Sequence, residues 1–221
     1  MKKLIVDARE PITLVGGGAL EKEDLEAAIA MAARVVAADS GADSAMNYGV
    51  TPDVVVGDFD SISDDAKARL GNARLLHVQE QDTTDFDKAL RSVAAPVVIA
   101  VGFLGARIDH QLAALHVLMQ EDRCPCILVG AQEILFHLRG TVEVPTARGE
   151  VVSLFPMQPV EGRSDGLEWP IEGLRFDPMQ QIGTSNRATG PVRLEALGCG
   201  LIVILEKHHL KDVMVQLAAQ S

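Results

Sequence analysis

The chain has 221 residues, a length that suits one large domain or two small ones with a buried core. Hydrophobic residues make up 48% and charged residues 23%, which is the profile of a globular chain without a disordered block. The formal net charge is -11 and Lys and Arg form no cluster, so a nucleic acid or an anionic membrane is excluded as a partner. An anionic small molecule stays compatible with this charge if a metal ion or local cations offset the field.

The first residues and the cysteines are both typical of a cytoplasmic protein. Residues 1–18 carry two lysines and then a charged break, so they lack the apolar core of a signal peptide. No apolar run is long enough to span a membrane. Cys124, Cys126 and Cys199 cannot form a disulfide framework, and CPC is not metal-ligand spacing. We therefore expect buried thiols in a reducing compartment.

The first half of the chain alternates apolar runs with helical patterns. Strands are expected at 12–15, 35–38, 54–56, 75–78 and 96–102. Helices are expected at 24–35, 40–49, 63–70, 85–93 and 109–120. Continuous Val and Ile runs separated by helices predict a doubly wound α/β domain with a mostly parallel sheet.

The second half has a different texture, because the helical periodicity disappears. Short strand-like pieces occur at 133–138, 141–144, 150–155, 174–177, 192–197 and 200–207. Polar, glycine-containing stretches such as EGRSDG (161–166) and GTSN (183–186) separate them as turns. This pattern predicts a smaller all-β sandwich. We place an α/β domain over 1–135 and the β domain over 136–221.

Acidic residues gather where the strands of the first half end. In an open parallel sheet, ligands bind outside the carboxyl ends of the strands. Carboxylates held close together raise one another's pKa and destabilise the fold unless a cation binds between them. Oxygen ligands without His or Cys indicate a hard divalent ion, Mg²⁺ in particular. The acids at these ends are Asp39, Asp43, Asp58, Asp60, Asp82, Asp85, Asp87 and Asp109.

The stretch VVVGDFDSISDD (54–65) contains two acidic pairs. Asp58 and Asp60 are separated by one residue, so both side chains point the same way and can share a metal if the backbone is extended. The alternative is an Asp-rich turn. For Asp64 and Asp65 we favour the start of the helix at 63–70 over a place in the site.

The stretch QDTTDFDKAL (81–90) opens a helix. Lys88 lies three residues after Asp85, so the two side chains can share one helix face, either as part of a triphosphate clamp or as a local ion pair. The side chains that can cap this helix are Asp82, Thr83 and Thr84.

The stretch GARIDHQLAAL (105–115) combines glycine with an arginine. Gly102 and Gly105 permit a close backbone approach, and Arg107 offers a planar fork for phosphate oxygens. Alternatively, Asp109 caps the next helix and His110 is a partly buried polar residue. The triple glycine at 16–18 is not GxGxxG and no Walker A pattern occurs, so any nucleotide is held by another device.

Together these segments resemble the thiamine pyrophosphokinase family. Their order and spacing cover nearly the whole chain, and GDFDSI followed by the DxTDF segment is highly specific. Ser40 and Ala106 stand where the family usually has glycine, and both changes are small. The matching stretches are ADSGAD (38–43), PDVVVGDFDSI (52–62), QDTTDFDKAL (81–90), GARIDHQLAAL (105–115), GLEWPI (166–171) and IGTSN (182–186).

The resemblance implies transfer of pyrophosphate from ATP to the hydroxyl of thiamine, giving thiamine pyrophosphate and AMP. It implies an α/β catalytic domain that binds ATP and Mg²⁺ over 1–135. A β-sandwich for thiamine binding and dimerisation would follow over 136–221. The family forms homodimers with active sites at the subunit interface.

The resemblance also assigns site residues. Asp58, Asp60 and Asp85 would hold Mg²⁺ with the ATP phosphates and, with Arg107 and Asp109, form the catalytic set. The resemblance also implies cofactor contacts in the same cleft for Asp39, Gln81, Asp82, Thr84, Lys88 and Arg107. Thiamine would meet Trp169, Ser185 and Asn186, from the partner subunit.

Several alternatives stay open at this stage. An aromatic face suits the cationic thiazolium ring of thiamine, but a core-packing role is also compatible with Trp169, the chain's one tryptophan. Ser185 and Asn186 also fit a hairpin turn. The base that accepts the hydroxyl proton is Asp109 or another cleft carboxylate. The rival functions are a thiamine or nucleotide sensor without turnover and a Mg²⁺-dependent nucleotide phosphohydrolase.

Overall fold

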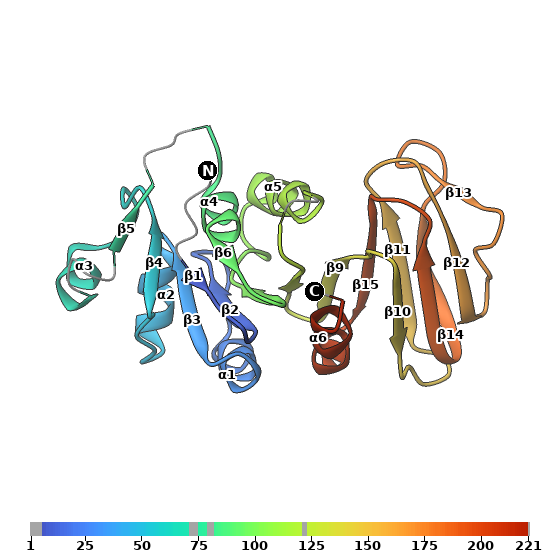
Figure 1. The fold of residues 1–221 in the computed structure, drawn as a ribbon, viewed down its shortest axis with the longest axis horizontal. Helices are drawn as coiled ribbons and strands as arrows, with labels where there is room; N and C mark the ends of the chain where they lie inside the picture. The colour runs from blue at the N-terminus through green and yellow to red at the C-terminus, as the bar shows by residue number, and fades with distance from the viewer. Residues whose placement is uncertain (1–5, 71–74, 79–81, 121–122, 221) are drawn as a thin grey trace. The chain divides into compact units, whose positions relative to one another are not determined.

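A computed structural model describes residues 6–70, 75–78, 82–120 and 123–220. The chain divides into two compact units between Ala131 and Gln132, and each is described separately below (Figure 1). Within the described ranges, no helix has both the length and the apolar character needed to cross a membrane.

The first unit is built on a parallel sheet with the strand order β8-β7-β2-β3-β4-β5. The chain runs outward from β2 to β5 and then returns to β7 on the other side of β2. The strand order therefore reverses between β2 and β7, which is where ligands bind in open parallel sheets. The strands are β2 (Ile12–Val15), β3 (Arg34–Ala38), β4 (Val54–Gly57), β5 (Leu75–His77), β7 (Val98–Val101) and β8 (Cys126–Val129).

Helices connect these strands, as the sequence pattern predicts. Every residue of β2, β7 and β8 is buried, because a parallel sheet is covered on both faces. Two short strands, β1 (Val6–Asp7) and β6 (Val93–Ala94), form a separate parallel pair. The helices are α1 (Lys22–Met31), α2 (Gly41–Asn47), α3 (Asp64–Leu70), α4 (Asp85–Arg91) and α5 (Ile108–Leu118).

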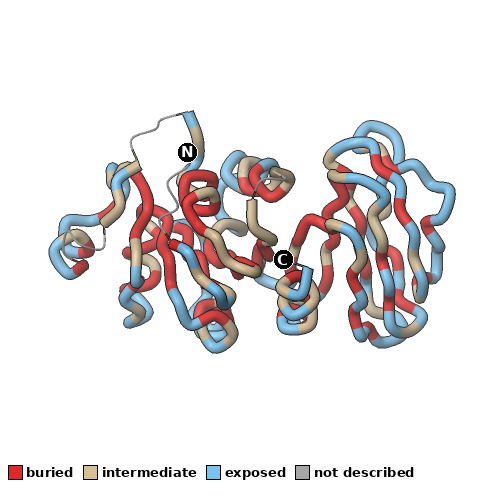
Figure 2. Tube along the Cα trace, in the orientation of Figure 1, coloured by how far each residue is buried: buried red, intermediate tan, exposed pale blue. Residues whose placement is uncertain are grey.

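The second unit is antiparallel, with the strand order β13-β12-β14-β11-β15-β9 and with β10 paired to β14. Buried and more exposed residues alternate along much of β12 and β14, whereas β15 is buried along most of its length (Figure 2). The strands are β9 (Glu133–His137), β10 (Thr141–Val144), β11 (Val151–Pro156), β12 (Val160–Leu167), β13 (Arg175–Phe176), β14 (Gly183–Ala196) and β15 (Leu201–Glu206).

Two stretches predicted as turns belong to strands. EGRSDG (161–166) lies inside β12, where Gly162 packs against the Glu195 carbonyl and Gly166, at φ 82°, coincides with a shift of register. GTSN (183–186) begins β14. These glycines serve close approach and a bulge rather than chain reversal, which is why the turn prediction was wrong.

The prediction that the second half contains no helix is also wrong. A 3₁₀ turn, η2 (Lys207–His209), leads into α6 (Leu210–Ala218), which packs against β10. Its buried side chains, Leu210, Val213 and Leu217, recur at helical spacing. This helical spacing covers only a short segment, and only η2 separates it from the strand β15. In the first unit, β8 is likewise missing from the predicted strands.

The packing of α2 on β2 yields a stability prediction for Gly41→Ala. A Cβ atom at Gly41 would lie 2.1 Å from the Val15 carbonyl oxygen, which is backbone and has little room to move. We expect a loss of unfolding free energy of about 1–3 kcal/mol, measured by denaturant unfolding. Gly190→Ala is the matched control, because nothing lies within 4 Å of a Cβ there. Equal stability of the two variants would contradict the packing argument.

Candidate active site

A cavity of about 600 Å³ opens in the first unit where β2, β3, β4 and β7 end. This position agrees with the rule that ligands bind at the carboxyl ends of parallel strands. The cavity is lined by Gly17, Gly18, Ala38, Ser40, Asp58, Asp60, Ser61, Thr83, Thr84, Asp85, Phe86, Lys88, Gly102, Phe103, Ala106, Arg107, His110 and Ala114.

Three carboxylates meet at one edge of this cavity. Asp39 follows β3, whereas Asp58 and Asp60 follow β4, and one oxygen of each lies within 4.8 Å of the others. The extended backbone expected between Asp58 and Asp60 is wrong, because Phe59 has a φ of 64°. Phe59 instead packs against the hydrophobic core. This left-handed residue lets one apolar ring turn inward while both neighbouring carboxylates approach Asp39.

Asp39 is the buried member of the group, with 1% of its surface exposed. Its Oδ2 accepts a hydrogen bond from the Ser61 amide at 3.2 Å, whereas its buried Oδ1 has no partner among the described residues. Burial raises the pKa of Asp39, and the negative charges of Asp85, Asp60 and Asp58 raise it further. Asp39 was predicted as a cofactor contact, and the structure groups it with Asp58 and Asp60.

Lys88 joins the acids of β4 to the start of α4. Its ammonium donates to Asp58 Oδ2 at 2.7 Å and to Asp85 Oδ1 at 3.2 Å, and only 3% of the side chain is exposed. The bond from Lys88 lowers the pKa of Asp58. Burial alone would lower the pKa of Lys88, but the bonds to the two acids hold it above the ordinary value. The ion pair considered for Lys88 and Asp85 is therefore present, and it forms part of the cavity wall.

The local sequence of α4 explains how Asp85 is placed. Of the candidate caps, Thr84 is the N-cap, and its hydroxyl accepts from the Asp87 amide at 3.2 Å. Asp85 is then the first helical residue, with Lys88 one turn later on the same face. Asp82 is exposed and does not line the cavity. Gln81 lies outside the described residues.

Arg107 projects at the cavity mouth in a two-bond ion pair with Asp109. Its Nε donates to Oδ1 at 3.1 Å and its Nη2 to Oδ2 at 2.5 Å, with more than half of each side chain exposed. The bonds from Arg107 lower the pKa of Asp109. The N-cap of α5 is Arg107, without a side-chain cap bond, so the capping role considered for Asp109 is wrong. His110 lines the cavity.

The remaining strand-end acids have structural partners. Asp43 accepts hydrogen bonds from the amide and hydroxyl of Ser63, and Asp87 pairs with Arg123 at 2.8 Å. Asp64 and Asp65 are the first residues of α3, as predicted. The sequence alone overcounted the site because helix starts also favour acids.

The triple glycine at 16–18 allows the segments around the cavity to approach closely, a role that its sequence pattern did not indicate. A Cβ at Gly16 or at Gly18 would lie 2.6 Å from the Gly102 carbonyl oxygen, so the ends of β2 and β7 approach closely here. A Cβ at Gly17 would lie 2.1 Å from the Ser40 hydroxyl. The usable signal was a buried strand running directly into three glycines rather than a nucleotide fingerprint.

In the second unit, Asn186 fixes the backbone of Trp169. The Asn186 side chain accepts from the Trp169 amide at 3.2 Å and donates to the Trp169 carbonyl at 2.7 Å. Trp169 itself is 55% exposed, so the core-packing alternative is wrong. Ser185 and Asn186 lie in β14 rather than in a hairpin turn, and Ser185 has a φ of 64°. Asn186 therefore fixes the backbone that carries the exposed indole, and its side-chain oxygen and nitrogen both bond to that backbone.

Comparison with known proteins shows which proteins this chain resembles. Residues 25–128 match the family model described as "Thiamin pyrophosphokinase, catalytic domain". The chain is 25% identical over 156 residues to Thiamin pyrophosphokinase 1 of Caenorhabditis elegans, covering 62% of this chain and 63% of that protein. It is 27% identical over 161 residues to Thiamine pyrophosphokinase 1 of Arabidopsis thaliana, covering 61% and 58%. The chain thus aligns with less than two thirds of the length of these relatives.

The fold is also similar to that of a solved structure. Thiamin pyrophosphokinase from Candida albicans superposes with a TM-score of 0.76 at 18% sequence identity, covering 91% of this chain and 93% of that one. At 18% identity this likeness shows a shared fold alone. The chemistry is therefore inferred from the acids and the cavity of this chain.

The raised pKa of Asp39 predicts that Asp39→Asn stabilises the protein in the absence of divalent ions. Ionised Asp39 costs stability in the fold, and this cost grows as pH rises through the folded pKa, which lies above 3.8. We expect a higher unfolding temperature than wild type at pH 7, and a gain that disappears well below pH 3.8, where the carboxyl is protonated in both the folded and the unfolded state. Asp65→Asn, at an exposed helix residue, is the control. A lower unfolding temperature for Asp39→Asn at pH 7 would contradict the argument.

Proposed function

We propose that this chain, a member of the thiamine pyrophosphokinase family, transfers a pyrophosphate group from ATP to the hydroxyl of thiamine. The products are thiamine pyrophosphate and AMP. The observation that carries the proposal is the group formed by Asp39, Asp58 and Asp60, of which Asp58 and Asp60, together with Lys88, line a 600 Å³ cavity. These four residues fall within the segment that the family's catalytic model matches.

The donor set fits Mg²⁺. Every ligand atom in the acid group is a carboxylate oxygen, and hard divalent ions prefer such ligands. The buried Asp39 Oδ1, without a partner among the described residues, is an acceptor of the kind that a cation satisfies. We propose that Asp58, Asp60 and Asp85 hold the ion with the ATP phosphates and that Asp39 completes the acidic wall. When bound, Mg²⁺ neutralises charge on the phosphate oxygens.

The remaining cavity residues suit a triphosphate. Lys88 supplies a fixed positive charge. Arg107 supplies a planar guanidinium at an exposed position, where it can release Asp109 and bind phosphate oxygens in its place. The thiamine hydroxyl oxygen attacks the β-phosphorus in line, the bond from this phosphorus to the α-phosphate oxygen breaks, and AMP leaves. Transfers of this kind depend mainly on positioning and on neutralising charge. A cleft carboxylate accepts the hydroxyl proton, and its pairing with Arg107 makes Asp109 the weaker base.

For thiamine we propose Trp169, Ser185 and Asn186 of a partner subunit in a homodimer. The exposed indole of Trp169 offers an aromatic face to the cationic thiazolium, and Asn186 holds the backbone that carries it. We interpret the two units as a doubly wound catalytic domain and a β-sandwich that binds thiamine.

The proposed reaction predicts that incubation with ATP, Mg²⁺ and thiamine yields equal amounts of AMP and thiamine pyrophosphate, measured by chromatography. We expect Asp58→Asn to lower kcat/KM on the order of 100-fold, because it removes a metal ligand and the partner of Lys88. Asp65→Asn, in the neighbouring helix, should keep wild-type turnover.

Other product patterns would overturn the proposal. Phosphate release without thiamine would indicate a phosphohydrolase, and binding without any product would indicate a sensor. Normal turnover of Asp58→Asn at limiting Mg²⁺ would show that the metal assignment is wrong.

The shared site predicts complementation between Asp60→Asn and Trp169→Ala. Each variant alone should be nearly inactive. Random exchange of subunits gives heterodimers with one intact site, so about a quarter of wild-type activity should return. The assay is turnover after unfolding and refolding the mixture, with each refolded variant alone as the control. No recovery, together with a monomer in sedimentation, would contradict the shared site.

A further inference from the structure

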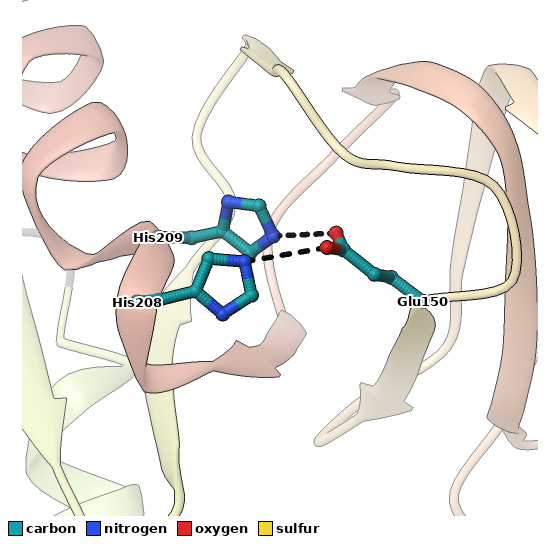
Figure 3. A group of neighbouring side chains, drawn as sticks. All are labelled: Glu150, His208 and His209. Atoms are coloured by element: carbon teal, nitrogen blue, oxygen red, sulfur yellow. Dashed lines mark hydrogen bonds and ion pairs between the residues drawn. The ribbon is translucent and has the colours of Figure 1, made fainter.

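Two histidines and a glutamate, none of which is assigned to the proposed reaction, converge in the second unit. Glu150 immediately precedes β11, whereas His208 and His209 form the end of η2. Figure 3 shows both imidazole rings directed at the Glu150 carboxylate. His209 Nε2 lies 2.8 Å from Glu150 Oε2, and His208 Nε2 lies 3.4 Å from Oε1. One ligand atom from each of the three residues lies within 4.8 Å of the others.

These separations suit a borderline transition-metal ion. Ligand atoms around a tetrahedral zinc bonded at 2.0–2.1 Å lie roughly 3.3 Å apart. Two imidazoles and one carboxylate are a common ligand set for Zn²⁺, and the half-exposed ring of His208 leaves a fourth position accessible to water. This donor set differs from the all-oxygen group at the cavity, which suits Mg²⁺.

The other ring nitrogens also face carboxylates. His208 Nδ1 lies 3.5 Å from Glu206 Oε2, and His209 Nδ1 lies 3.9 Å from Asp212 Oδ2. Histidine ligands of metals characteristically direct their second ring nitrogen at a carboxylate, which fixes the tautomer. Both histidines here have that arrangement.

Without a metal ion, the hydrogen-bonding groups of the two imidazoles are incompletely used. The ring centroids of His208 and His209 are 3.9 Å apart, and both Nε2 atoms face the carboxylate of Glu150. A neutral ring has one N–H, so one of its nitrogens must direct a lone pair at a carboxylate oxygen. The buried Nδ1 of His209 has no hydrogen-bond partner among the described residues. A metal ion at the two Nε2 atoms leaves each Nδ1–H free to donate outward.

We propose that Glu150, His208 and His209 form a binding site for Zn²⁺ or a similar divalent transition-metal ion. The bound ion would join the segment before β11 to the C-terminal helix α6, which follows His209 directly. Its role is to stabilise the second unit, and it takes no part in the proposed transfer reaction.

The test is titration of the full chain with Zn²⁺, followed by calorimetry, in excess Mg²⁺ that saturates the all-oxygen site. We expect one Zn²⁺ per chain, a higher unfolding temperature with Zn²⁺, and absorption bands typical of nitrogen-ligated tetrahedral Co²⁺ when Co²⁺ replaces it. His208→Ala should abolish all three effects, and its fold should persist because this side chain is 53% exposed. His116→Ala, at an exposed helix histidine, is the matched control.

A second variant separates metal binding from simple packing. Glu206→Gln leaves the three ligands intact and removes the carboxylate that faces His208, so Zn²⁺ affinity should fall about 10- to 100-fold. Glu161→Gln, an exposed glutamate on β12, should bind as wild type does. Transfer activity with Mg²⁺ should be unchanged in His208→Ala. Absence of Zn²⁺ binding in excess Mg²⁺, or wild-type affinity in His208→Ala, would overturn the proposal.

Discussion

The ammonium of Lys88, buried between Asp58 and Asp85, allows carboxylates from three different segments to converge at the end of the parallel sheet. Without a cation, these acids and Asp39 would repel one another, and the raised pKa of Asp39 records part of that cost. One lysine offsets only one of these charges. The uncompensated negative charge favours a divalent ion, and this is the basis of the nucleotide site proposed above. The strands and helices of the first unit hold these groups in place.

The sequence predicted which acids gather at this edge of the sheet better than it predicted how they approach one another. Strand ends, helix starts and the acids at them could be read from periodicity and spacing, because parallel strands bury continuous apolar runs. The mutual approach of Asp58 and Asp60 was predicted for the wrong reason, since it depends on the left-handed Phe59 rather than on an extended strand. Phe59 in this conformation packs against a buried cluster that includes Ala37, Met46 and Leu70, which come from β3, α2 and α3. Local patterns do not encode such tertiary contacts, and they also made Asp43 and Asp87 resemble site residues although both have structural partners.

The second unit was harder to predict for related reasons. Glycines at 162 and 166 resemble turn residues, but here they allow strands to approach and bulge. The histidine pair at 208 and 209 gave no signal in the sequence, because its partner Glu150 is 59 residues away from His209. The two hydrogen bonds between the Asn186 side chain and the backbone of Trp169 were not predicted either, because the two residues are 17 positions apart. Folding brings these groups together, and only the folded chain reveals their partners.

The central claim is that Asp58, Asp60 and Asp85, with Asp39 and Lys88 beside them, are the divalent-metal end of a nucleotide site. The most direct measurement is a crystal structure with Mn²⁺ and a non-hydrolysable ATP analogue, in which anomalous scattering locates the ion. The account predicts an anomalous peak bonded to carboxylates of this group, with the phosphates extending toward Lys88 and Arg107. An ion bound away from these carboxylates, with Lys88 still their sole cation, would contradict it.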